Sequence, residues 1–396
     1  MSTSNNKADG ATGPAVLQLV PQLNSGGAER STVDLAGALD RAGFRALVAS
    51  EGGRLVPELE ALGGEWIRMP LEAKSPLSLL ANARKIAGLI RTRNISLLHA
   101  RSRAPAWSAL WAARRTGIPL VTTWHGAYAA DLALKRFYNS VMLRGDAVIA
   151  NSHWTAAHMR ANYRLTPKKC VVIHRGVDTD RFDPARVHPE RAVALRRSWG
   201  IAAEGVAVLL PGRLTRWKGQ LVLIDAMARF ARDSAGAHLH AVLAGDEQGG
   251  GYRAEIERAI HGRGIEHHVS LLEHIEDMPA AYAAADIVVS ASTKPEAFGR
   301  VAAEAGAMAR AVVATDHGGA RETVLAGTSG VVVPPGDAEA LADALRWLRD
   351  AGPEHRAAMG AAGRAHVLQN FTLARMTGDT LVLYREVLAA HSAAPG

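Results

Sequence analysis

Ala285-Asp286-Ile287-Val288-Val289-Ser290 and, a few residues on, Pro295-Glu296-Ala297-Phe298-Gly299-Arg300-Val301-Ala302-Ala303-Glu304 are the runs that decide the fold. The first run is apolar almost throughout, which is typical of a buried parallel strand, and the small residues from Val301 to Met308 favour a helix packed on it. Pro295 disfavours helical geometry in the residue before it, and Gly299 lets the backbone approach a neighbour closely. We therefore expect a strand, a turn and a helix that begins near Gly299.

The turn between this strand and this helix carries groups that suit a ligand. Backbone amides at a helix start attract anions. Glu296 lies on the loop and Glu304 about one turn into the helix, and we expect both to face a bound ligand. A carboxylate repels phosphate but accepts hydrogen bonds from sugar hydroxyls. One carboxylate on each side of an anion-binding turn therefore fits a ligand in which phosphates lie between a ribose and a second sugar. The alternative is a surface helix start with a solvated Glu304, which the flanking apolar runs disfavour.

The same alternation of apolar runs and helical segments fills both halves of the chain. The runs are 16–20, 46–50, 66–69, 96–100, 120–123 and 147–151, then 206–210, 239–244, 269–272, 287–290, 311–314 and 331–333. This pattern predicts an α/β fold with two Rossmann-like, doubly wound parallel sheets. At 396 residues the chain also exceeds what one core usually supports. We assign a disordered tail to 1–13, the first domain to 14–185, the second to 200–368 and a last helix to 369–392, with a polar linker before residue 200.

Two features of the first half follow apolar runs, at the sheet edge where ligands bind in such folds. Gly26 and Gly27 open a helical segment, but without a G-x-G-x-x-G fingerprint a dinucleotide is a poor match, and a plain tight turn is the alternative. His125, in Thr123-Trp124-His125-Gly126, directly follows a strand, where a histidine is as often structural as functional. We predict no metal site, because no cluster of His, Asp or Glu at ligand spacing accompanies it.

Arg213 and Lys218 are the corresponding feature of the second half. They lie five residues apart around a turn that follows the run 206–210. Two cations so placed can hold one diphosphate. A cation at a helix N-terminus is electrostatically unfavourable unless an anion is bound there. The pair therefore favours a bound anion over the alternative of two exposed side chains.

Charge is unevenly distributed along the chain. The net charge is +8, with 24 Lys and Arg against 14 Asp and Glu in residues 1–185, which is +10, and 22 against 24 in residues 186–396, which is −2. No acid occurs between Glu72 and Asp131, where nine basic residues do. Such a face favours an anionic membrane or a phosphorylated acceptor. We expect no nucleic acid, because no binding motif accompanies the charge, and a solvated basic surface is the alternative.

Cysteine usage and hydropathy indicate the compartment. The single cysteine, Cys170, permits no intrachain disulfide and suits a reducing environment. No stretch approaches twenty uninterrupted apolar residues, and Met1 to Gly13 lacks a signal-peptide core. We expect a cytoplasmic protein, with the inner face of the membrane as a further location.

Several motifs together resemble the family 4 retaining glycosyltransferases of the GT-B fold, the glycosyl transferases group 1. They are the two glutamates separated by seven residues, Ala311-Val312-Val313-Ala314-Thr315, Gly318-Gly319-Ala320-Arg321-Glu322, the glycine-arginine and lysine-glycine pairs of the 212–219 turn, and Gly176-Val177-Asp178 with Phe182. The resemblance covers nearly the whole chain after the tail. It implies two domains facing a cleft and a C-terminal helix that crosses back to the first domain.

The resemblance also implies a role for each candidate residue. Arg213 and Lys218 would bind the donor pyrophosphate and stabilise the leaving nucleoside diphosphate. Glu304 would bind the ribose, and Glu296 and His125 would lie near the transferred sugar. The remaining donor-binding residues would be Gly26, Gly27, Phe298, Gly299 and the backbone of His274 and Ile275, although glycine is usual in the family where Glu273 or His274 stands.

The expected activity is that of a retaining, hexosyl-type glycosyltransferase. The donor would be a UDP- or GDP-linked sugar, and the acceptor a cytoplasm-facing lipid-linked glycan or lipopolysaccharide core. We expect no cofactor and no metal, in agreement with the absence of an Asp-x-Asp motif from the sequence. Two alternatives stay open, a nucleotide-sugar epimerase of the same fold and a non-catalytic binder of phosphorylated glycans. Retention rests on the resemblance alone, and Glu296 as a covalent nucleophile is the less favoured mechanism.

Overall fold

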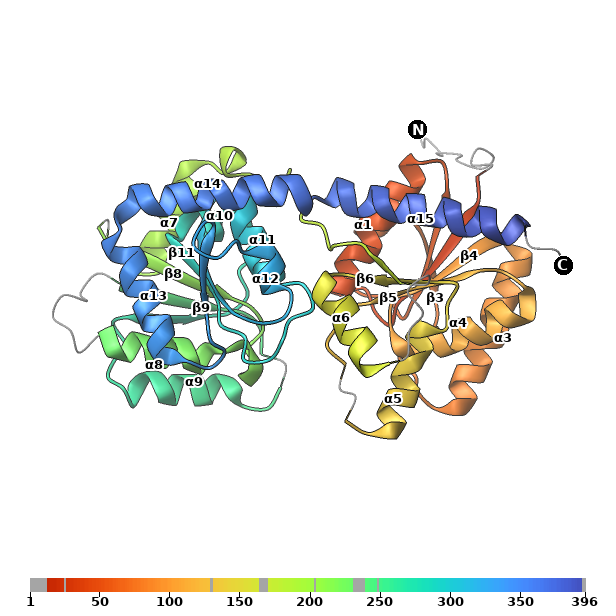
Figure 1. The fold of residues 1–396 in the computed structure, drawn as a ribbon, viewed down its shortest axis with the longest axis horizontal. Coiled ribbons are helices and arrows are strands. Elements are labelled where there is room, and N and C mark those ends of the chain that lie inside the picture. Colours follow the sequence, from red (N-terminus) through yellow and green to blue (C-terminus); the bar gives the residue numbers. More distant parts are fainter. Residues whose placement is uncertain are drawn as a thin grey trace, which may run out of the picture. The chain divides into compact units, whose positions relative to one another are not determined.

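The chain divides into two compact units, each with its own parallel sheet (Figure 1). The computed structural model describes residues 13–24, 26–128, 131–163, 170–202, 204–230, 239–247 and 249–393. The expected tail lies outside these ranges except for Gly13. The first unit comprises Met1–His174 and Ala374–Gly396, and the second comprises Arg175–Leu373.

Among the described residues, the first unit holds a seven-stranded sheet in which every pairing is parallel. Its strands, in spatial order, are β3 (Glu65–Arg68), β2 (Arg45–Ser50), β1 (Ala15–Leu19), β4 (Ile95–Ala100), β5 (Leu120–Trp124), β6 (Ala147–Ala150) and β7 (Cys170–Val172). The helical segments are α1 (Gly27–Arg41), α2 (Val56–Ala61), α3 (Pro76–Thr92), α4 (Arg103–Thr116), α5 (Ala133–Asn139), the 3-10 turn η1 (Ser140–Leu143), α6 (His153–Asn162) and α15 (Leu373–Ala393). The order reverses between β1 and β4, which makes the sheet doubly wound.

The described part of the second unit holds a six-stranded parallel sheet. Its strands, in spatial order, are β10 (Val269–Leu272), β9 (Leu239–Ala244), β8 (Val206–Pro211), β11 (Ile287–Ser290), β12 (Ala311–Thr315) and β13 (Gly330–Val333). The helical segments are η3 (Pro184–Arg186), α7 (Pro189–Ser198), η4 (Arg216–Lys218), α8 (Gln220–Phe230), α9 (Tyr252–His261), α10 (Met278–Ala284), α11 (Arg300–Ala307), α12 (Ala320–Thr323), α13 (Ala338–Asp350) and α14 (Gly352–Asn370). Here the order reverses between β8 and β11.

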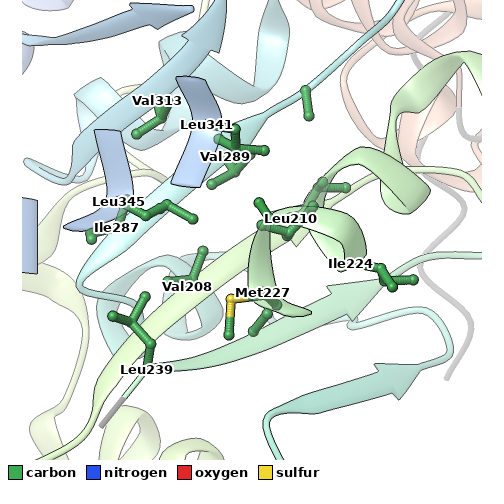
Figure 2. Packing of buried hydrophobic residues seen from close by; sticks show 14 of the residues in the cluster. Val208, Leu210, Ile224, Met227, Leu239, Ile287, Val289, Val313, Leu341 and Leu345 are labelled. Carbon is green, nitrogen blue, oxygen red and sulfur yellow. The ribbon is translucent and has the colours of Figure 1, made fainter. Parts of the chain in front are cut away.

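Alternate residues of the second sheet face two different hydrophobic cores. Val208 and Leu210 of β8 pack on one side with Ile224 and Met227 of α8 (Figure 2). Ala207 and Leu209 of the same strand pack on the other side, with residues of α10, α11 and α14. A strand that is buried on both faces must be apolar at every position, and for this reason β8 and β11 read as continuous apolar runs in the sequence.

The C-terminal helix α15 belongs to the first unit, as expected from the fold class (Figure 1). Its Tyr384 is fully buried, and the hydroxyl lies 2.5 Å from Nδ1 of His99 in β4. The other ring nitrogen of His99 lies 2.7 Å from Oγ1 of Thr123 in β5. Burial, aided by the charge of Arg101, lowers the pKa of His99 well below its ordinary value, so the imidazole is neutral. A chain of buried hydrogen bonds thus ties α15 to two neighbouring strands.

The segment expected to be a polar linker is folded into the second unit. It contains α7, and Trp199, directly after that helix, is 3% exposed and belongs to the core that includes α10 and α11. Val177 forms a parallel bridge with Thr372 and also packs in this core. The boundary between the two units therefore lies between His174 and Arg175. It lies before the expected linker because Val177 and Trp199 are buried in the core of the second unit.

No helix of the described ranges has the length and apolar character needed to cross a bilayer.

Replacing Tyr384 with Phe is expected to destabilise the first unit. The substitution leaves the buried Nδ1 of His99 without this hydrogen bond, which costs about 1–3 kcal/mol. Urea titration of the full chain measures the loss. The matched control is Val382→Ala in the same helix, whose side chain is 51% exposed and whose loss should stay within about 0.5 kcal/mol. Equal unfolding midpoints for Tyr384→Phe and the wild type would contradict this account of how α15 is held.

Candidate functional site

Three loops meet at the carboxyl edge of the second sheet, next to the point where the strand order reverses. The loop after β8 meets the loop after β11 where the amide of Thr293 donates to the carbonyl of Trp217, at 2.7 Å. The loop after β11 meets the loop after β12 where the amide of Gly319 donates to the carbonyl of Glu296, at 2.8 Å, and where Nε2 of His317 lies 2.7 Å from the carbonyl of Ser292. Ligands of open α/β sheets bind at such a reversal.

Two glycines allow this close approach of the loops. Gly219 has φ +79°, and a Cβ there would lie 1.9 Å from the carbonyl oxygen of Ala291. Gly318 has φ +65°, and a Cβ there would lie 2.3 Å from the carbonyl oxygen of Glu296. Only glycine satisfies both the left-handed conformation and the contact. The three loops are therefore locked together by their backbones.

Lys218 and Glu296 form an ion pair across two of these loops. Nζ of Lys218 lies 2.8 Å from Oε1 of Glu296, and the two side chains are 15% and 14% exposed. The same oxygen accepts a hydrogen bond from the hydroxyl of Ser292, and the ammonium lies 4.6 Å from the centre of the Trp217 ring. Burial alone would raise the pKa of Glu296, but the charge and hydrogen bond of Lys218, together with Ser292, lower it overall. The carboxylate is therefore ionised at neutral pH, beside a cation of fixed position.

Glu304 of α11 is buried and already hydrogen-bonded within the second unit. It is 7% exposed, and its two oxygens accept hydrogen bonds from Nε of Arg300, at 2.7 Å, and from the hydroxyl of Tyr282, at 2.9 Å. Burial and the adjacent carboxylate raise the pKa of Tyr282 well above its ordinary value, so its hydroxyl remains a donor. Because each carboxylate oxygen has two lone pairs, Glu304 keeps the capacity to accept from a ligand hydroxyl. Its side chain is held in place before any ligand arrives.

The helix that carries Glu304 begins where the sequence predicts. Gly299 is the N-cap of α11, with φ +86°, and the first helical residue is Arg300. The side chain of Phe298 is 2% exposed and its ring lies 5.5 Å from that of Phe371, in the core. A contact of Phe298 with a donor would therefore be made by its main chain.

The other expected donor residues of the second unit lie on neighbouring loops. Arg213 is exposed on the loop after β8, and its carbonyl accepts a hydrogen bond of 3.0 Å from Nε2 of the buried Gln220. His274 follows β10, with Nδ1 3.7 Å from the carboxylate of Asp246, and both side chains are about half exposed. Ile275 packs partly against the core. Arg213 thus shares a loop with Lys218, while His274 and Ile275 lie toward the β9–β10 side of the sheet.

Gly26, Gly27 and His125 belong to the first unit. Gly26 is the N-cap of α1, which begins at Gly27. The carboxylate of Glu29 lies over this turn, since a Cβ on Gly26 would be 1.9 Å from its Oε2. A negative group at a helix start is favourable, so an anionic ligand at this turn would have to displace Glu29.

His125 directly follows β5, as the sequence predicts. The turn that carries it is fixed by Trp124, a fully buried residue whose Nε1 donates to the carbonyl of Gly126 at 2.6 Å. Thr123, two residues before His125, is the hydroxyl that contacts His99. The position of His125 is therefore set by the buried groups on the strand before it.

Four residues of the site in the second unit form polar contacts that the sequence did not predict: Ser292, Arg300, Tyr282 and His317. Arg300 could have been found, because an arginine four residues before a glutamate in a helix faces it. Ser292 also lies four residues before its partner Glu296, but in a loop, where spacing does not predict contact. Tyr282 is 22 residues from Glu304 in sequence and meets it only through the packing of α10 on the sheet.

Comparisons with known proteins agree on one family of enzymes. The Glycosyltransferase Family 4 model matches residues 25–181, and the Glycosyl transferases group 1 model matches residues 194–366. A D-inositol 3-phosphate glycosyltransferase of Salinispora tropica is 35% identical over 306 residues, which are 71% of this chain and 62% of that protein. The chain therefore spans less than two thirds of that relative's length.

Solved structures are similar over almost the entire chain. A crystal structure of a glycosyltransferase from Rickettsia africae has a TM-score of 0.87 and 36% identity, and covers 95% of this chain and 99% of that one. Anabaena HepE in complex with UDP-glucose has a TM-score of 0.81 and 26% identity, with 94% and 99% covered.

Removing the charge of Lys218 is expected to destabilise the second unit in a pH-dependent way. Lys218→Met leaves the Glu296 carboxylate buried without its cation, which costs about 3 kcal/mol near neutral pH. Because folding lowers the pKa of Glu296, the ionised pair stabilises the protein above the ordinary value of 4.5, and this contribution disappears as pH falls through the lower folded-state pKa. The difference between variant and wild type in urea titrations should therefore shrink in acid.

Two further variants control this experiment. Lys218→Met combined with Glu296→Gln should recover part of the loss, because no buried charge is left unpaired. Lys135→Met removes an exposed partner of Asp131, 3.0 Å away, and should cost less than about 0.5 kcal/mol. A Lys218→Met loss that does not change with pH would show that the pair has no such role.

Proposed function

Because the chain belongs to the glycosyltransferases, with a family 4 domain followed by a group 1 domain, we propose that it transfers a sugar from a nucleoside-diphosphate sugar to an acceptor hydroxyl. The observation that carries this proposal is the Lys218–Glu296 pair beside the start of α11. It joins a group that binds phosphate to a group that accepts hydrogen bonds from sugar hydroxyls. The likeness to HepE, whose structure contains UDP-glucose, supports a nucleotide-sugar donor.

The charges of the site match those that develop in the reaction. When the bond between the anomeric carbon and the diphosphate breaks, negative charge grows on the leaving phosphate. Lys218, Arg213 and the N-terminus of α11 are positive groups on adjoining loops, and they would oppose that charge. Glu304 would accept from the ribose hydroxyls, and Glu296 from those of the transferred sugar. In this arrangement no divalent ion is required, since side chains supply the positive charge.

The environment of Glu296 favours a hydrogen-bonding role over a nucleophilic one. One of its oxygens already accepts from Lys218 and from Ser292. Hydrogen bonds of this kind stabilise the carboxylate and reduce its tendency to form a covalent bond. We therefore propose that retention proceeds by attack of the acceptor on the face from which the phosphate leaves, with a phosphate oxygen taking the acceptor proton. We also propose that His125 lies near the transferred sugar and the acceptor during the reaction.

The proposed acceptor is a glycan exposed to the cytoplasm, either lipid-linked or part of a lipopolysaccharide core. The basic excess of residues 1–185 supports an acceptor, or a surface around it, with negative charge. An epimerase of the same fold is the second candidate, because the donor-binding residues would serve it equally. An epimerase would convert the donor without an acceptor, whereas a glycosyltransferase would need the acceptor.

Donor binding is expected to depend on Lys218 and Glu304. Losing one charge-assisted contact to phosphate should weaken UDP or GDP binding about 10- to 100-fold in Lys218→Ala. Glu304→Ala should weaken it about tenfold through the lost ribose contact. Isothermal titration calorimetry measures both, and Lys294→Ala, an exposed lysine of the same loop as Glu296, should bind as the wild type does. Unchanged affinity in both site variants would mean that the donor binds elsewhere.

Consumption of the donor is expected to require an acceptor and to continue at the same rate when divalent metal ions are chelated. With a radiolabelled nucleotide sugar and a membrane extract as the acceptor source, label should enter the glycan fraction at the same rate with and without EDTA. Conversion of the donor to an epimer without extract would favour the second candidate. Strict dependence on added Mg²⁺ or Mn²⁺ would overturn the proposed role of Lys218 and Arg213.

A further inference from the structure

We propose that His317 is a positioning residue of the site in the second unit, whose imidazole takes up a proton when a nucleotide sugar binds and so replaces Lys218 as the cation beside Glu296. This inference rests on the proposed function, because it needs a diphosphate that competes for Lys218. His317 lies on the loop after β12, which is one of the three loops that form the site.

The imidazole of His317 is held by one of its two nitrogens. Nε2 lies 2.7 Å from the carbonyl of Ser292, and because a carbonyl only accepts, Nε2 carries a hydrogen. In the neutral ring Nδ1 is then an acceptor. This atom is buried and has no hydrogen-bond partner in the part of the chain that the structure describes. Buried polar atoms without a partner are rare and costly, so Nδ1 indicates a role beyond packing.

Ser292 lies between this imidazole and the carboxylate of Glu296. Its carbonyl accepts from His317, and its hydroxyl donates to Oε1 of Glu296. The same loops are joined again where the amide of Gly319 donates to the carbonyl of Glu296, at 2.8 Å. Burial raises the pKa of Glu296, whereas Lys218, Ser292 and a charge on His317 lower it. A protonated His317 would therefore stabilise the same carboxylate that Lys218 stabilises before a ligand binds.

The other charged groups around His317 are already paired or exposed. On the three loops and the helices that follow the last two of them, these groups are Arg213, Lys218, Lys294, Glu296, Arg300, Glu304, Asp316, Arg321 and Glu322. Asp316, the neighbour of His317 in sequence, is paired with Arg321 at 2.7 Å. Arg213 and Lys294 are exposed. Glu296 is the group whose cation a diphosphate would take, and His317 is the titratable group held beside it.

The arrival of a nucleotide sugar changes the charge around Glu296. Its two phosphates are negative and compete with Glu296 for the ammonium of Lys218. A sugar hydroxyl can donate to Glu296 but carries no charge, so a buried carboxylate would remain near the phosphates without a cation. A proton from the solvent on Nδ1 of His317 supplies that charge near neutral pH. When the nucleotide leaves and Lys218 pairs with Glu296 again, the proton returns to the solvent.

Two simpler roles fit His317 less well. As a link between the loops after β11 and β12 it is redundant, because the hydroxyl of Thr315 donates to the same Ser292 carbonyl at 2.9 Å and the Gly319 amide joins the loops independently. As a direct contact of the sugar it would have to expose Nδ1, which is buried. Both roles become outcomes of the test.

Isothermal titration calorimetry in buffers of different ionisation enthalpy counts the protons that the full chain takes up on binding. UDP-glucose and GDP-mannose serve as probes, because the phosphates of a nucleotide sugar are diesters that hold no proton near neutral pH. At pH 7.5 the wild type should gain about half a proton per nucleotide sugar bound. A bound state that holds more protons is favoured in acid, so the affinity should fall about tenfold between pH 6.5 and pH 8.5.

Two variants and a matched control locate the proton. His317→Gln keeps an N–H for the Ser292 carbonyl but cannot be protonated. It should bind without proton uptake, about tenfold more weakly than the wild type at pH 6.5 and equally well at pH 8.5. Glu296→Gln removes the charge that favours the proton and should also abolish the uptake. His261→Gln, at a side chain of α9 that is 87% exposed, should keep the uptake of the wild type.

Four results would overturn the proposal. Binding by the wild type without proton uptake would do so on its own, whether or not the variants fold, and would leave the donor site in place. Proton uptake that persists in His317→Gln would assign the proton to another group. An equal loss of affinity in His317→Gln at both pH values would indicate a structural link or a direct contact. If neither nucleotide sugar binds, the proposed donor chemistry fails, and this inference fails with it.

Discussion

The ion pair between Lys218 and Glu296 is the interaction on which the candidate site depends. Moving two charges out of water is costly, and their attraction compensates only when the geometry is good and the remaining polar atoms are satisfied. Here the distance is 2.8 Å, Ser292 donates a further hydrogen bond, and the Trp217 ring lies beside the ammonium. The pair therefore fixes the relative position of the loops after β8 and β11, from which the site is built.

The sheet topology makes this pair geometrically accessible. Adjacent strands β8 and β11 are separated by 75 residues of sequence, from Pro211 to Ile287, yet their carboxyl ends lie side by side because the strand order reverses there. Gly219 and Gly318 then bring the loop backbones closer than any side chain would allow. The strand order brings the loops together, and two glycines in the left-handed conformation allow their backbones to come into contact.

The sequence predicted those features that depend on local pattern. Each of the twelve apolar runs matches a strand to within one residue at either end, because such runs report burial on both faces of a sheet. The start of α11 follows from Gly299. The hydrogen bond from Tyr282 to Glu304 has no signal in the sequence, because only tertiary packing brings these two residues together. The contact between His99 and Tyr384 spans 285 residues and has no local signal. The linker was misplaced because Val177 and Trp199 bury themselves in a core made by distant strands.

Glu304 and Glu296 differ in how their carboxylates are held before a ligand binds. Glu304 is restrained by Arg300 and Tyr282, so a ribose would meet an acceptor that is already oriented. Glu296 would share its cation with an incoming phosphate, because a diphosphate beside Lys218 competes with the carboxylate for the same ammonium. A sugar hydroxyl that donates to Glu296 would compensate for that loss, whereas a free nucleoside diphosphate has no such group to offer. The resting ion pair would therefore favour the intact donor over the spent nucleotide, and its re-formation would help the nucleotide to leave.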